Sequence, residues 1–114
     1  MRSGVNATLG IIEAWTSAVP KGKLLLLDLW ADSTPLWNIS YSFFGHTFIW
    51  CMLHNFGGTD GMWGDLTQIS NGPTMARHVT LPGAMVGTGL TMEGANQSTG
   101  LLINWLRLPS IDFG

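Results

Sequence analysis

Charged side chains are scarce in this 114-residue chain. They make up 11% of the sequence, whereas soluble domains average about 25%. Hydrophobic residues make up 46%, and six Trp and six Met are among them. A small domain exposes much of its surface to water and needs polar residues there. The composition therefore predicts that neighbouring polypeptide covers part of this chain.

Several chemistries lack the residues that they require. The single cysteine, Cys51, excludes an internal disulfide and a CxxC metal or redox pair. The five Lys and Arg are scattered and the formal net charge is −2, which argues against nucleic acid as a partner. The three histidines form no H-E-x-x-H motif, and no G-x-S-x-G motif occurs. We predict no metal and no other cofactor.

Long hydrophobic runs are also missing, so we expect no membrane partner. The first ten residues lack the charged head and apolar core of a signal peptide. Three N-glycosylation sequons nevertheless occur, and they would matter only if the protein enters the secretory route: Asn6, Asn38 and Asn96.

Three short apolar runs are typical of buried strands, namely Leu24–Trp30, Phe48–Leu53 and Ala84–Leu90. Apart from Asp28, the first is continuously apolar, as expected for a strand covered on both faces. The runs are separated by stretches long enough for crossover connections. This spacing favours parallel pairing in an α/β architecture.

Helices are expected between these runs. Apolar residues recur at helical spacing from residue 7 to Val19, and Pro20 ends the pattern. A turn or helix is expected over Met62–Ile69, and another short helix after Pro73, because proline suits a first helical turn. The segment Trp37–Phe43 is ambiguous.

Polar residues stand at or just beyond the end of each predicted strand: Asp28, Asp32, His54, Asn55 and Glu93. Parallel strands bring their carboxyl ends to one edge, where ligands bind in α/β folds. For Asp28 we favour an internal hydrogen-bond acceptor over a ligand contact. His54 and Asn55 suit either a sugar site or the capping of a tight turn. The residue pattern alone favours a surface or capping role for Glu93 over catalysis.

Three segments closely resemble the α-N-acetylglucosaminidase family: residues 21–33, 48–58 and 85–94. The resemblance covers roughly residues 9 to 98 and implies a (β/α)₈ barrel of the TIM type, which needs about 250 residues when complete. The expected fold is therefore an incomplete α/β barrel fragment with about three parallel strands and connecting helices. Residues 1–98 would be the partial barrel and 99–114 a divergent tail. We hypothesise a partial gene product or a partial gene model, truncated at both ends.

The resemblance implies a retaining glycoside hydrolase that removes terminal α-linked N-acetylglucosamine from glycans. In animals its substrate is heparan sulfate and its location the lysosome. Glu93 matches the position of the family's nucleophile. Substrate-binding positions are carried over to residues at the first two strand ends: Leu29, Leu53, His54, Asn55 and Phe56. The expected partners are a glycan and the remainder of the parent enzyme.

The family's acid/base glutamate lies in an Asn-Glu motif that this chain lacks. Its only earlier glutamate, Glu13, falls in the predicted first helix. We therefore expect the chain to be inactive alone, and a non-catalytic sugar-binding or inert remnant is the alternative. An unrelated α/β interaction module would explain the apolar composition but not the ordered motifs.

Overall fold

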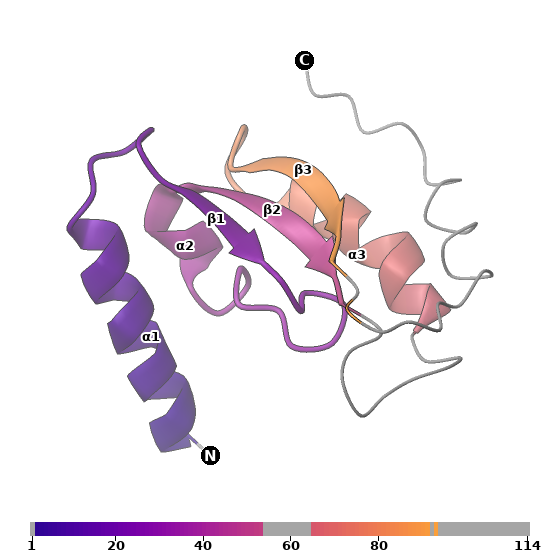
Figure 1. Ribbon diagram of the computed structural model, residues 1–114, viewed down its shortest axis with the longest axis horizontal. Helices are drawn as coiled ribbons and strands as arrows, with labels where there is room; N and C mark the ends of the chain where they lie inside the picture. The colour runs from indigo at the N-terminus through magenta and orange to yellow at the C-terminus, as the bar shows by residue number, and fades with distance from the viewer. Residues whose placement is uncertain (1, 54–64, 92, 94–114) are drawn as a thin grey trace.

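The computed structural model describes residues 2–53, 65–91 and 93 (Figure 1). Its strands are β1 (Leu25–Asp28), β2 (Thr47–Met52) and β3 (Met85–Leu90). They form one parallel sheet in the order β1-β2-β3. The predicted parallel α/β arrangement is therefore confirmed.

The helices are α1 (Arg2–Ser17), α2 (Tyr41–Gly45) and α3 (Leu66–Val79). In Figure 1, α2 and α3 lie behind the sheet and α1 lies beside its β1 edge. The first helix begins before residue 7 and ends two residues short of Val19, so both expected boundaries shift. No helix in the described ranges is long and apolar enough to cross a membrane.

Strand β1 has one covered face and one open face. Leu25 and Leu27 are 50% and 51% exposed, and Leu29 beyond the strand is 48% exposed. Asp28, which alternation places on the opposite face, is only 2% exposed. The described part of the chain thus covers one face of β1, whereas the apolar run predicted a strand covered on both.

The core lies between the sheet and the helices. Phe48, Trp50 and Met52 alternate along β2 and are each at most 1% exposed. The α3 residue Ile69 belongs to the same buried cluster. At Gly72 of α3, an added Cβ would lie 2.6 Å from Cζ2 of Trp50, so glycine allows the helix to approach the sheet closely.

Helix α3 contradicts the expectation of a new helix after Pro73. Pro73 lies inside α3, which begins after the N-cap residue Asp65. Proline in a helix interior removes one hydrogen bond and normally costs about 3 kcal/mol. Here Pro73 is buried on the same face as Ile69 and Ala76, and this packing offsets the local penalty. Of the helix expected over 62–69, residues 62–64 lie outside the described ranges, and 66–69 form the start of α3.

The ambiguous segment before β2 forms an unusual left-handed turn. Residues 41–44 in α2 have φ values between 50° and 57°. Left-handed backbone costs roughly 1–2 kcal/mol per residue for side chains with a Cβ atom. Two contacts favour this turn. Ser40 Oγ accepts a hydrogen bond from the Phe43 N–H, and the Phe43 ring packs against that of Phe48 with their centroids 5.4 Å apart.

Candidate functional site

The carboxyl ends of the three strands meet at one edge of the sheet. At this edge Leu29 follows β1, Leu53 follows β2 and Glu93 follows β3. Leu53 is half-buried, whereas Leu29 and Glu93 are exposed. The structure thus places three of the six candidate residues just past neighbouring parallel strand ends. The other three, His54, Asn55 and Phe56, lie outside the described residues.

Hydrogen bonds beyond the strands join these ends together. The Thr91 N–H donates to the Met52 carbonyl at 2.9 Å. The Thr91 hydroxyl lies 3.0 Å from that same oxygen and 3.3 Å from the Leu29 carbonyl. These contacts connect the residues after β3 to the ends of β1 and β2. Glu93 is two residues further along the chain.

Asp32 makes a second connection, from the loop after β1 to the end of β2. Its side chain is 7% exposed, and its Oδ1 accepts a hydrogen bond from the Leu53 N–H at 3.0 Å. The sequence analysis grouped Asp32 with the polar residues at strand ends but did not identify this contact. No sequence pattern indicates an acceptor for a backbone N–H 21 residues away.

Asp28 is an internal hydrogen-bond acceptor, as the sequence analysis favoured. Its Oδ2 accepts from the backbone N–H groups of Leu36 and Trp37, at 2.8 and 2.9 Å. Burial raises the pKa of this carboxyl above its ordinary value, and the two hydrogen bonds oppose the rise. Because the folded-state pKa exceeds that of the unfolded chain, Asp28 contributes most to stability at low pH. That contribution falls as the pH rises through the raised pKa.

Two substitutions separate the hydrogen bonds of Asp28 from its charge. Asp28→Asn keeps an oxygen that can accept from both N–H groups, so we expect the Leu36 and Trp37 amides to stay protected. Asp28→Leu leaves both without this acceptor, and we expect their hydrogen exchange to accelerate by about tenfold or more. Hydrogen exchange at fixed pH, followed by mass spectrometry with this segment in a complete barrel, compares the two variants. Equal protection in the two would show that Asp28 does not hold this loop.

Cys51 is a buried thiol without nucleophilic character. It is 0% exposed in β2, which confirms the expected role as a small buried residue. Burial raises its pKa to about 11, and the negative charge of Asp28 adds to the rise. The thiol is therefore protonated at neutral pH. No group of three or more metal-ligating side chains occurs within the ranges that the structure describes.

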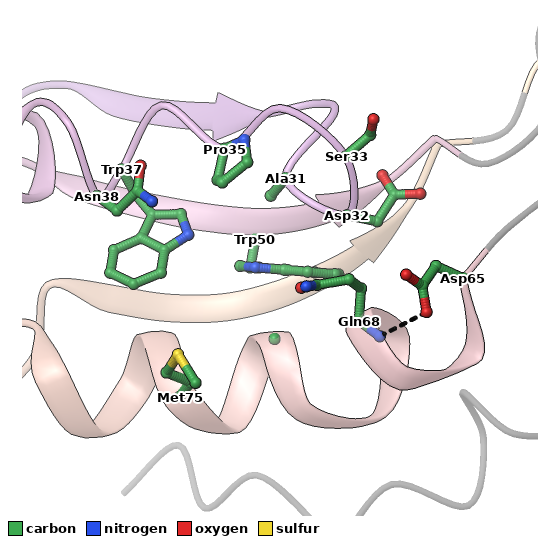
Figure 2. Close-up of a pocket in the computed structure, with 11 residues that line it drawn as sticks. Ala31, Asp32, Ser33, Pro35, Trp37, Asn38, Trp50, Asp65, Gln68 and Met75 are labelled. Atoms are coloured by element: carbon green, nitrogen blue, oxygen red, sulfur yellow. Dashed lines mark hydrogen bonds between the residues drawn. The ribbon is translucent and has the colours of Figure 1, made fainter.

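A cavity of about 550 Å³ is lined by three parts of the chain (Figure 2). These are the loop that follows β1, the strand β2 and the helix α3. Trp50 projects into this space from β2, and Gln68 and Met75 face it from α3. Leu29, Leu53 and Glu93 do not line it. The cavity is therefore distinct from the group of candidate residues at the strand ends.

Three parallel strands, with candidate residues at their carboxyl ends, have the organisation of part of a (β/α)₈ barrel. A family model, described as the α-N-acetylglucosaminidase TIM-barrel domain, matches residues 8–102. The chain therefore belongs to the α-N-acetylglucosaminidase TIM-barrel family, and its fold is an incomplete α/β barrel. The boundary expected at residue 98 stays a prediction.

Known proteins of this family resemble the chain over most of its length. It is 50% identical over 88 residues to human α-N-acetylglucosaminidase, a match that covers 76% of the chain and 12% of the human protein. A family 89 glycoside hydrolase from Clostridium perfringens, in complex with 2-acetamido-1,2-dideoxynojirmycin, is 30% identical. Its TM-score is 0.66, and the match covers 76% of this chain and 10% of that one.

A second structure of the bacterial enzyme carries two glutamate-to-glutamine substitutions and contains its substrate, GlcNAc-α-1,4-galactose. It is 29% identical with a TM-score of 0.63, and the match covers 83% of this chain and 11% of that one. The chain thus spans about one eighth or less of the length of these relatives.

Proposed function

We propose that this chain is part of the catalytic barrel of a retaining α-N-acetylglucosaminidase, with Glu93 as the nucleophile. The observation that carries the proposal is the family match together with the position of Glu93. This residue is exposed, follows β3, and stands at the edge where Leu29 and Leu53 follow the neighbouring strands. Catalytic residues of such barrels come from the ends of several strands.

The proposed reaction has two steps and needs two carboxyl groups about 5–5.5 Å apart. In the first step the Glu93 carboxylate attacks the anomeric carbon while a protonated carboxyl donates its proton to the departing oxygen. The product is a glycosyl ester on Glu93. In the second step the other carboxylate takes a proton from water, and the resulting attack releases the sugar and restores Glu93.

The second carboxyl group is expected from polypeptide upstream of the matched segment. The two glutamates that are substituted in the bacterial enzyme lie more than one hundred residues apart in its sequence. Fewer residues than that precede Glu93 in this chain. Glu13, the only earlier glutamate, is exposed on α1. We therefore propose that the chain needs the rest of the barrel for turnover.

The sugar pocket is proposed to use residues after β1 and β2. Apolar side chains pack against the CH groups of a sugar, and fixed polar groups bind its hydroxyls. Leu29 and Leu53 supply the first kind of surface, together with Phe56, and His54 and Asn55 supply the second. A terminal α-linked N-acetylglucosamine agrees with the substrate of the bacterial relative. Heparan sulfate as the glycan and the lysosome as the location rest on the family resemblance.

The remainder of the parent enzyme is the proposed protein partner. It would cover the open face of β1, where Leu25 and Leu27 are about half exposed. It would also pair with the outer edges of β1 and β3, because closing a barrel leaves no strand edge unpaired.

A hybrid enzyme tests the proposal. Residues 8–102 of this chain replace the matching segment of human α-N-acetylglucosaminidase, which supplies the other strands. We expect the hybrid enzyme to hydrolyse 4-nitrophenyl α-N-acetylglucosaminide, as shown by 4-nitrophenol release. A folded hybrid enzyme that binds the sugar without hydrolysing it would contradict the catalytic role of this segment.

The alternative is a non-catalytic sugar-binding or inert remnant, which the lack of a second suitably placed glutamate favours for this polypeptide alone. Titration of the isolated chain with N-acetylglucosamine distinguishes the two forms. Binding without hydrolysis would indicate a sugar-binding remnant, and no binding would indicate an inert one.

A further inference from the structure

We propose that Asp32 is a positioning residue for Leu53 in the proposed sugar pocket. The inference rests on the proposed function, because it assumes that Leu53 contacts the sugar. Asp32 would act through the backbone of Leu53, without touching substrate.

Two consecutive residues after β1 hold the end of β2. The Ala31 N–H donates to the Cys51 carbonyl at 3.1 Å. The Asp32 Oδ1 then accepts from the Leu53 N–H at 3.0 Å. Leu53 is the first residue after β2, so this contact fixes the backbone of a residue of the proposed sugar pocket.

The Asp32 contact is well suited to positioning. Asp32 is buried, and hydrogen bonds to a carboxylate are shorter and stronger than those between neutral groups. Without this acceptor, the Leu53 N–H must find water or another partner, and the backbone shifts to reach it. A displaced Leu53 fits less well against the sugar, so the effect should appear in sugar affinity.

Asp65 provides a matched control. Its Oδ1 accepts from the backbone N–H groups of Thr67 and Gln68, at 2.9 and 3.2 Å, as the N-cap of α3. Like Asp32, it is a carboxylate that organises backbone, and it also lines the cavity shown in Figure 2. In the described ranges its side chain accepts hydrogen bonds from these two N–H groups and none from Leu53.

The test measures binding of 2-acetamido-1,2-dideoxynojirmycin, the compound bound by the bacterial relative, to the hybrid enzyme by calorimetry. We expect Asp32→Leu to raise its Kd by about tenfold or more. Asp32→Asn keeps an acceptor oxygen at the same distance and should stay within about threefold of the unsubstituted hybrid enzyme. Asp65→Leu should leave the Kd unchanged while lowering thermal stability.

Asp32→Ser is a second variant. The short polar side chain of serine is easier to accommodate at this buried position than that of leucine, yet it does not reach the Leu53 N–H. It should weaken binding as Asp32→Leu does. Equal Kd values for the Asp32 and Asp65 variants would overturn the proposal, and so would a loss of affinity in Asp32→Asn equal to that in Asp32→Leu. A wrong assignment of the nucleophile would appear separately, as hydrolysis by Glu93→Gln, and would leave these binding comparisons intact.

Discussion

Replacing Glu93 by Gln in the hybrid enzyme is expected to lower kcat for an α-N-acetylglucosaminide by about 10⁴-fold or more. An amide is a poor nucleophile, so the glycosyl ester cannot form and the first step is blocked. Sugar binding should persist, because the substitution preserves the size of the side chain. Release of 4-nitrophenol measures turnover, and calorimetry measures binding.

Glu13→Gln is the matched control for this substitution. Glu13 is an exposed glutamate on α1, on a different element from the strand ends, and its variant should keep full activity. Glu93→Gly offers a further check, because added azide can occupy the vacated space and attack the anomeric carbon directly. The expected product is the β-glycosyl azide, of inverted configuration. Full activity of Glu93→Gln would remove Glu93 from its proposed role.

The isolated chain is expected to unfold without a sharp cooperative transition. Within the described ranges its sheet has two unpaired outer edges, and one face of β1 carries two leucines, Leu25 and Leu27, about half exposed to water. Burial of this face is a large part of the stability of a complete barrel, and the isolated chain lacks it. Circular dichroism during heating at low concentration measures this. A sharp, concentration-independent transition would contradict the dependence of the chain on the rest of the enzyme.

Leu27→Ala tests the same prediction by comparing the isolated chain with the hybrid enzyme. In the isolated chain Leu27 is 51% exposed, so its removal should change the thermal profile little. In the hybrid enzyme, where we expect the face to be covered, the same change should cost about 2–5 kcal/mol of barrel stability. Equal effects in both contexts would show that the face is not buried by the remainder of the barrel.

The strands and their pairing were predictable because they depend on short-range features of the sequence. An apolar run such as Leu24–Trp30 has strand length, and crossover connections of sufficient length favour parallel neighbours. The role of Asp28 was also predictable, since a carboxylate in such a run needs hydrogen-bond donors. What the pattern did not reveal is that one face of β1 is open in the described residues.

Other features depend on contacts between distant residues. Pro73 sits inside α3 on the buried face that also carries Ile69, and tertiary burial outweighs its preference for a first turn. The energetic cost of the left-handed backbone at residues 41–44 is offset by the packing of Phe43 on Phe48. The bond from Asp32 to Leu53 joins two loops that only sheet formation brings together.

The most direct test of the central claim is to trap the glycosyl ester. A 5-fluoro α-N-acetylglucosaminyl fluoride should form the ester in the hybrid enzyme faster than water removes it, because the ring fluorine slows both steps and the good fluoride leaving group restores the rate of the first. Peptide mass spectrometry then locates the attached sugar. The account predicts that the sugar is on Glu93. A sugar attached to any other carboxylate would contradict it.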